Sequence, residues 1–323
     1  MRQQRMGRTR TLKAAALLGL TLLVTACGTN TNGNGDAAAG SGDNRITIVT
    51  TISQIADPIS VIGGDKVDVL SLMGPGVDPH LYNATQGDIA KLDRADLVLY
   101  SGLHLEGQMN EVFEEIGKTR PTLAISESIP EEELLKDEQG DIDPHVWFDM
   151  DLWKQALDNA TEELKQLSPE DAQYFDDNRS AYFAQLDTLN AESKAKLAEI
   201  PEGKRTLVTA HDAFGYFGRA NGIDVVGLQG LSTEDEIGVS DINDTISLLT
   251  QYNIPAVFVE SSINPKSIEA VIEGAKSKGL EVKVGGELFS DAMGEAGTPE
   301  GTYLGMYKHN VETIYAALSG GGE

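Results

Sequence analysis

Three histidines stand in segments that could position an imidazole for metal binding. His80 and His145 occur in the same tripeptide, Asp-Pro-His, and His211 closely follows the apolar run Thr206–Thr209. Proline restricts the backbone, so a histidine beside it loses less freedom when its ring is oriented. Imidazole nitrogen suits zinc, manganese and other divalent ions, and a carboxylate is a natural fourth ligand. The histidines predict a metal site, but their spacing does not identify its carboxylate.

The spacing of these histidines excludes sites that are carried by one short segment. Neighbouring members of the set are 65 and 66 residues apart, which is too far for a zinc finger or a helix-borne H-E-x-x-H pair. The site must be assembled from separate loops, with His80 and His145 from one half of the chain and His211 from the other. His104 and His309 lack a comparable loop signal, and we expect His309 to face solvent from a helix.

The elements that must position these loops alternate between strand and helix in both halves. Such alternation predicts βαβ units and parallel sheets, in which ligands bind at the carboxyl ends of the strands. The expected strands are Ile46–Thr50, Val67–Leu72, Leu97–Tyr100 and Thr122–Ile125 in the first half, and Thr206–Thr209, Val225–Leu228, Ala256–Val259 and Val282–Val284 in the second.

A long helix is expected between the two halves. Ser168 is a good N-cap, Pro169 suits the first helical position and two acids follow, whereas Pro201 would end the helix. A helix over 169–199 would be about 46 Å long. The interpretation is an α/β protein of two lobes, 45–150 and 202–323, each with a central parallel sheet flanked by helices, and joined by connecting helices over 151–201 that include this spine helix. The alternative is two shorter helices with a kink near Asn190.

The first 26 residues are typical of an export signal. Five basic residues precede the apolar run 14–26, which is too short to span a bilayer. Cys27, the only cysteine, follows Val-Thr-Ala, which resembles a bacterial lipobox with cleavage before Cys27 and lipidation of its thiol. The alternative is an ordinary secretory signal. Residues 27–44 are rich in Gly, Asn and Ser and predict a flexible tether.

Charge and cysteine content exclude several classes of function. The formal net charge of −26 over 323 residues argues against nucleic-acid binding, because the chain lacks the basic residues that neutralise phosphates. A single cysteine excludes an intramolecular disulfide, a zinc finger and an iron–sulfur cluster.

Six segments together resemble the manganese- and zinc-binding lipoproteins of bacterial ABC importers, the cluster A-I solute-binding proteins. The resemblance implies two α/β lobes bridged by one long helix, an ion between the lobes, and the ligands His80, His145, His211 and Asp291. Candidates for orienting the imidazoles, by proximity in these motifs, are Asp149, Asp212 and Glu260. The segments are GPGVDPHLY (74–82), GLHLEG (102–107), DPHVWFD (143–149), TAHDAFGYF (209–217), VFVESS (257–262) and GELFSDAMG (286–294).

The same resemblance favours manganese as the transported ion and leaves zinc open. Zinc-dedicated relatives commonly carry a His-rich loop before the second ligand, and Glu131–Asp143 contains no histidine. Some manganese and iron relatives have Glu where this chain has His211, which keeps Zn²⁺ beside Mn²⁺ as a candidate. Four protein ligands would close the shell of a tetrahedral ion, as a carrier requires and a catalytic zinc site does not.

The resemblance also implies partners and a location. We expect an ABC permease with its ATPase subunit as partners, and a monomer that a lipid anchor at Cys27 holds at the outer face of the cytoplasmic membrane. The alternatives are a zinc-specific carrier, a surface adhesin, and a metal-dependent hydrolase with Glu260 or Asp212 as the base.

Overall fold

Four parallel strands form the sheet of the N-terminal lobe in a computed structural model that describes residues 45–320. Their order is β2-β1-β3-β4, and the middle strands are rich in Val, Ile and Leu because helices and loops bury both faces. The elements are β1 (Ile46–Thr50), α1 (Ser53–Gly63), β2 (Val67–Ser71), α2 (Gln86–Leu92), β3 (Leu97–Tyr100), α3 (Asn110–Ile116) and β4 (Thr122–Ala124).

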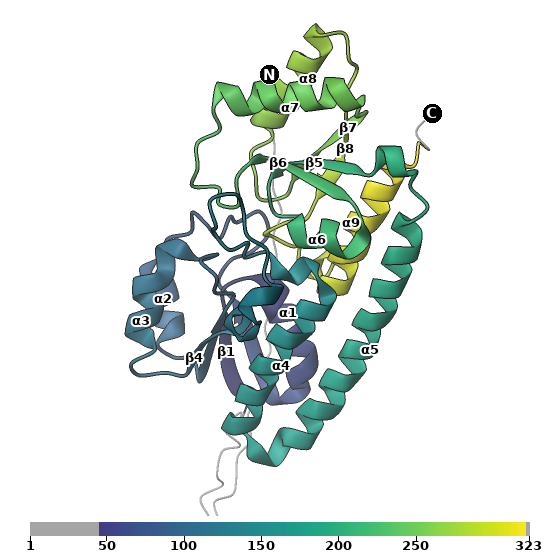
Figure 1. Ribbon diagram of the computed structural model, residues 1–323. Helices are drawn as coiled ribbons and strands as arrows, with labels where there is room; N and C mark the ends of the chain where they lie inside the picture. Colours follow the sequence, from purple (N-terminus) through teal and green to yellow (C-terminus); the bar gives the residue numbers. More distant parts are fainter. Residues whose placement is uncertain (1–44, 321–323) are drawn as a thin grey trace, which may run out of the picture. The chain divides into compact units, whose positions relative to one another are not determined.

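The strands of the C-terminal lobe are also parallel, but they are hydrogen-bonded in two pairs, β5–β6 and β7–β8, with β5 lying against β7. The helices α7 and α8 pack on each other beside these strands, and α9 packs along β8 (Figure 1). The elements are β5 (Thr206–His211), α6 (Gly215–Asn221), β6 (Asp224–Gln229), α7 (Val239–Tyr252), β7 (Ala256–Glu260), α8 (Lys266–Ser277), β8 (Lys283–Leu288) and α9 (Tyr303–Leu318).

Two helices connect the lobes, and the second is the spine helix that the sequence predicts. After α4 (Met150–Leu167), residues Pro169–Asp171 form a 3₁₀ turn, so α5 runs over Ala172–Leu197, three residues shorter at its start than expected. Its 26 residues span about 39 Å. The helix continues through Asn190 without interruption, which excludes the alternative of two shorter helices.

The spine helix contacts elements of both lobes and holds them on a shared core. It packs on α1 and α4 toward one end and on α6 and α9 toward the other (Figure 1). Phe175, Tyr182, Leu186 and Leu197 of α5 are buried in the larger hydrophobic cluster, which extends from the N-terminal sheet to α9. Because the two lobes share one close-packed core, their relative orientation is fixed by packing rather than by a loop hinge.

The structure says nothing of the export signal 1–26, of Cys27 or of the tether 27–44, which lie outside the described residues. Within residues 45–320, every helix is too short or too polar to cross a membrane.

Candidate metal centre

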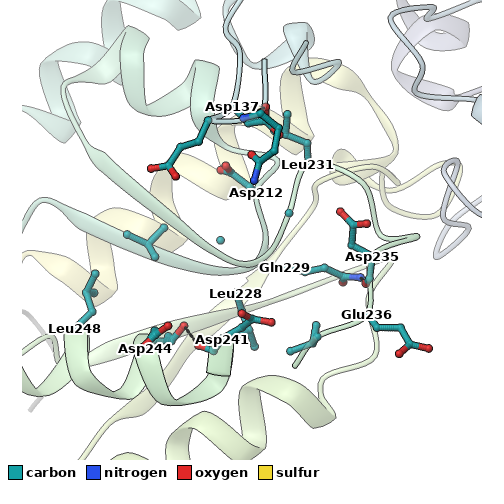
Figure 2. A pocket seen from close by; sticks show the side chains of 17 residues that line it. Asp137, Asp212, Leu228, Gln229, Leu231, Asp235, Glu236, Asp241, Asp244 and Leu248 are labelled. Atoms are coloured by element: carbon teal, nitrogen blue, oxygen red, sulfur yellow. Dashed lines mark hydrogen bonds between the residues drawn. The ribbon is translucent and has the colours of Figure 1, made fainter. Parts of the chain in front are cut away.

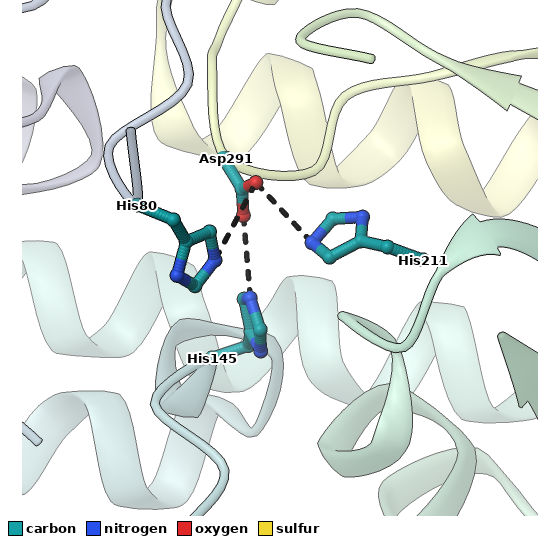
Figure 3. Close-up of side chains that lie close together, drawn as sticks. All are labelled: His80, His145, His211 and Asp291. Carbon is teal, nitrogen blue, oxygen red and sulfur yellow. Dashed lines mark ion pairs between the residues drawn. The ribbon is translucent and has the colours of Figure 1, made fainter. Parts of the chain in front are cut away.

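Four side chains from distant parts of the chain meet in one buried cluster (Figure 3). His80, His145, His211 and Asp291 each offer one possible ligand atom, and these atoms all lie within 4.8 Å of one another. The Oδ2 atom of Asp291 is 3.2 Å from Nε2 of His211 and 3.9 Å from Nε2 of His80, and its Oδ1 atom is 3.4 Å from Nε2 of His145. The side chains are at most 2% exposed. The four residues that the resemblance implies are therefore together in space.

Each lobe supplies loops or strand ends to this cluster. His80 lies in the loop after β2, and His145 immediately precedes the 3₁₀ turn Val146–Phe148 that leads into α4. His211 is the last residue of β5, and Asp291 lies in the loop after β8. Three of the four thus follow the carboxyl end of a parallel strand, the edge at which α/β sheets usually bind ligands.

Four of the atoms that face the centre of the cluster have no hydrogen-bond partner, whereas Oδ2 of Asp291 accepts a hydrogen bond of 3.5 Å from Ser262 Oγ. Nε2 of all three imidazoles and Oδ1 of Asp291 are buried without a partner. Buried polar atoms are normally paired, since leaving one unpaired costs free energy. Three nitrogen donors and a carboxylate converging on one point are a set that a divalent cation would satisfy together.

Carboxylates contact two of the imidazoles at the ring nitrogen that faces away from the centre. Asp143 Oδ1 is 2.8 Å from Nδ1 of His145, and Glu260 Oε2 is 2.6 Å from Nδ1 of His211. Each carboxylate also accepts the backbone N–H of the same histidine, at 2.9 Å. A proton held on Nδ1 leaves the lone pair of Nε2 free for an ion, so these contacts set the tautomer that metal binding needs.

His80 is held differently from the other two histidines. Its backbone N–H donates to Asp78 Oδ1 at 2.9 Å, whereas in residues 45–320 we find no carboxylate in contact with its Nδ1. The second oxygen of Asp78 accepts a hydrogen bond from Thr233 Oγ1 at 2.6 Å, which ties the His80 loop to the C-terminal lobe.

The protonation of the cluster follows from these contacts. Burial alone would lower the pKa of His145, but its hydrogen bond to Asp143 and the negative charges of Asp143 and Asp291 outweigh burial and raise the pKa to about 9. Burial likewise opposes the charge of His211, and attraction to Glu260 and Asp291 raises its pKa well above the usual value. For His80, burial dominates and lowers the pKa to about 3. Without an ion, the contacts therefore favour the charged forms of His145 and His211 beside the carboxylate of Asp291, and the neutral form of His80.

Of the three acids expected to orient imidazoles, Glu260 alone contacts one in the part of the chain that is described. Asp149 is the N-cap of α4, accepts from the N–H groups of Asp151 and Leu152, and pairs with Arg219. This geometry gives Asp149 a role at the start of α4 instead. The orienting carboxylate that sequence reasoning missed is Asp143, although it stands two residues before His145 in the same Asp-Pro-His motif.

Asp212, the third of these acids, lines a separate cavity of about 580 Å³ beside β6 and α7 (Figure 2). Burial raises the pKa of Asp212. None of the four clustered residues lines this cavity, and their side chains, at most 2% exposed, are enclosed by protein. The acidic side chains around the cavity are Asp137, Glu138, Asp212, Asp235, Glu236, Asp241 and Asp244.

Comparisons with known proteins point to one family. Residues 48–317 match the model of the ZnuA family, described as zinc-uptake complex component A, periplasmic. The chain is 50% identical over 305 residues to the manganese-binding lipoprotein MntA of Bacillus subtilis, covering 94% of this chain and 98% of MntA. It is 31% identical over 282 residues to the manganese ABC transporter substrate-binding lipoprotein PsaA of Streptococcus mitis, covering 85% of this chain and 90% of PsaA.

A solved structure agrees with these sequence matches. The fold resembles that of the periplasmic zinc-binding protein TroA of Treponema pallidum with a TM-score of 0.84 at 48% identity, covering 85% of this chain and 99% of TroA. The likeness confirms the expected α/β fold of two lobes joined by a long helix.

Proposed function

This chain belongs to the ZnuA family, and from that membership we propose that it is an extracytoplasmic solute-binding lipoprotein which captures a divalent transition-metal ion and delivers it to an ABC import permease. The observation that carries the proposal is the buried cluster of three imidazoles and one carboxylate, in which four inward atoms have no hydrogen-bond partner. Donor atoms around a tetrahedral zinc ion lie about 3.3 Å apart. The two carboxylate oxygens of Asp291 lie 3.2 to 3.9 Å from the imidazole nitrogens, and the four possible ligand atoms all lie within 4.8 Å of one another.

We propose His80, His145, His211 and Asp291 as the ligands. A carrier has to hold its ion without reacting, and four protein donors leave no position for the water that a catalytic zinc site activates. The enclosed cluster therefore favours binding and transport over the hydrolase alternative. Glu260, one of the two candidate bases of a hydrolase, is in contact with His211 at 2.6 Å, and the other, Asp212, lines a cavity that none of the four clustered residues lines.

We favour manganese as the ion, with zinc as the second candidate. The relative at 50% identity is named a manganese-binding lipoprotein, and the segment Glu131–Asp143 has no histidine. A similar structure is named a zinc-binding protein, and three imidazoles suit zinc well. Zinc binds nitrogen-rich sites more tightly than manganese, so selection in the cell would have to come from geometry and from metal availability.

The proposed partners are the permease and its ATPase subunit, since PsaA is named as the substrate-binding lipoprotein of an ABC transporter. Lipidation of Cys27 and the tether 27–44 would hold a monomer at the outer face of the cytoplasmic membrane. The lobe boundaries at 45–150 and 202–323, with connecting helices over 151–201, remain part of this proposal.

Metal analysis and competition titration of the mature lipoprotein test the proposal. We expect one manganese or zinc ion per chain, and loss of tight binding in Asp291→Ala, because the carboxylate cancels one of the two positive charges of the ion. Circular dichroism would check that the variant is folded. Affinity unchanged in a folded Asp291→Ala protein would refute the ligand set.

A further inference from the structure

The backbone just before Asp291 is held by one buried amide side chain. Asn310, on α9, accepts the N–H of Phe289 at Oδ1 over 2.9 Å and donates from Nδ2 to the carbonyl oxygen of Phe289 over 2.7 Å. Asn310 is fully buried. Two hydrogen bonds to one residue fix the direction of the chain as well as its position, two residues before the carboxylate.

Two further side chains hold the residues on either side of Asp291. Gln54 Nε2, from α1 of the N-terminal lobe, donates to the carbonyl of Ser290 at 3.0 Å. Ser261 Oγ, just after β7, donates to the carbonyl of Ala292 at 2.8 Å. Each of these contacts is a single hydrogen bond, whereas Asn310 makes a pair.

The two hydrogen bonds of Asn310 bind the backbone at the end of β8 in the way that a neighbouring strand would. Within the described residues β8 is paired with β7 only, so its other edge faces α9. His309 Nε2 lies 3.0 Å from the carbonyl oxygen of Glu287, and Asn310 contacts both backbone groups of Phe289. Residues 287 and 289 are those whose polar groups point to the same edge of an extended strand. Contrary to the expectation that it faces solvent, His309 is only 33% exposed.

Two glycines let α9 come close enough for these contacts. A Cβ at Gly285 would lie 3.1 Å from Cβ of Ala317 on α9, and one at Gly286 would lie 2.4 Å from Cγ2 of Thr313 on the same helix. Gly286 also has a φ of +150°, which side chains rarely adopt. The Gly-Gly pair therefore permits the short distance between helix and strand that Asn310 uses.

We propose that Asn310 is a positioning residue for metal binding, which holds the chain at Phe289 so that the carboxylate of Asp291 points at the three imidazoles. The inference rests on the proposed function, because it treats Asp291 as a ligand. Residues that orient a metal ligand typically change metal affinity by about 10- to 100-fold when they are replaced.

The first test compares two buried asparagines of the C-terminal lobe in the mature lipoprotein. We expect Asn310→Ala to weaken zinc or manganese binding by about 10- to 100-fold in a competition titration. Asn221 is the matched control, because its Nδ2 donates to Phe217 and Tyr307 and no hydrogen bond connects it to residues 289–292. Asn221→Ala should lower thermal stability and leave metal affinity within about twofold.

The second test separates positioning from a general loss of structure. In an Asp291→Ala background, Asn310→Ala should change the remaining affinity by less than about twofold, since the group that it positions is gone. An equal loss in both backgrounds, or an unchanged affinity in Asn310→Ala alone, would overturn the inference. If Asp291→Ala itself leaves the metal affinity unchanged, the proposed ligand set is refuted as well as the inference about Asn310.

A third variant covers the case in which Asn310→Ala does not fold. Asn310→Leu keeps the branching at Cγ and fills the space of the amide with a somewhat larger group, so it leaves no cavity, and it removes both hydrogen bonds to Phe289. We expect the same loss of affinity and the same dependence on Asp291. Wild-type affinity in a folded Asn310→Leu protein would contradict the proposal.

Discussion

His145 and His211 differ from His80 in what contacts the ring nitrogen that faces away from the cluster. Asp143 and Glu260 contact the first two at 2.8 and 2.6 Å, whereas His80 is held through its backbone by Asp78. The imidazole rings of the cluster therefore lie in two kinds of electrostatic environment. The pKa values of His145 and His211 are raised by these contacts, whereas burial lowers that of His80.

The three histidines therefore differ in how they would contribute to metal binding. The carboxylate-backed imidazoles make a strong site, but an ion has to displace their protons. The loop of His80 is instead connected to the other lobe through Asp78 and Thr233. The four predictions that follow address this contrast, from the largest expected effect to the smallest.

The largest effect should be that of pH. With the pKa of His145 raised to about 9 and that of His211 raised well above its usual value, we expect metal binding at pH 7 to release about two protons. Affinity should therefore rise with pH, by about tenfold per released proton for each pH unit. Calorimetry in buffers with different ionisation enthalpies measures the number of protons.

The variants sharpen this prediction. His80→Ala should release as many protons per ion as the wild type, because the pKa of His80 is lowered to about 3 and the ring is neutral at pH 7. His145→Ala should release one proton fewer. Heat that does not depend on the buffer in the wild-type protein would contradict the assigned charges.

The stability of the metal-free protein should also change with pH, and His145 and His80 contribute slopes of opposite sign. The folded pKa of His145, about 9, lies above its unfolded value near 6.5, so its contribution is complete below pH 6.5 and is lost as the pH rises toward 9. For His80 the folded pKa is the lower one, so its contribution is lost as the pH falls below 6.5. Urea denaturation between pH 5 and 9 would show both slopes.

The second prediction concerns the orienting carboxylates. Asp143→Asn and Glu260→Gln keep the shape of each side chain and remove its charge, and each should weaken metal binding by about 10- to 100-fold. Asp78→Asn is the matched change at His80. It should cost less than about tenfold, because Asp78 bonds to the backbone of His80 and not to its ring. Equal losses of metal affinity in all three variants, measured by competition titration, would contradict the proposed difference between His80 and the other two histidines.

The third prediction concerns the connection between the His80 loop and the C-terminal lobe. Thr233→Val removes the hydroxyl that donates to Asp78, and one hydrogen bond of about 0.5–1.5 kcal/mol corresponds to release about 2- to 10-fold faster. Stopped-flow mixing with a chelator measures this rate. The control is Thr250→Val, whose hydroxyl bonds to Ile246 within α7 and which should release metal at the wild-type rate.

The smallest effect on affinity is expected at Asp149, the acid that the motif suggested and the structure places elsewhere. Asp149→Ala should lower the free energy of unfolding by about 1 kcal/mol through loss of the α4 cap, with metal affinity unchanged. Denaturant unfolding measures the free energy of unfolding, and a metal titration of the same sample measures the affinity. A loss of affinity like that of Asp143→Asn would mean that Asp149 also supports the site.

Local patterns in the sequence were sufficient for much of the fold. Alternating apolar runs predicted the parallel strands, and the cap and proline near Ser168 predicted the spine helix, apart from the 3₁₀ turn at its start. They did not predict that the C-terminal strands pair as β5–β6 and β7–β8. Strand pairing depends on contacts between residues far apart in the chain, and no local pattern encodes it.

The residues of the candidate site were likewise predictable from local sequence patterns only in part. Asp-Pro flanks identified His80 and His145 from the sequence, and a place just after an apolar run identified His211. Asp291 came from resemblance to a family, because one acid among 51 has no distinguishing spacing.

Only the tertiary structure decided which groups surround these four residues. It placed Asp143 rather than Asp149 behind an imidazole, and it brought Asn310 of α9 against the strand end before Asp291. The sequence by itself determines which side chains can donate to an ion and which elements carry them. Their mutual distances, and therefore their pKa values and their contribution to binding, arise only when burial removes water and packing brings remote segments together.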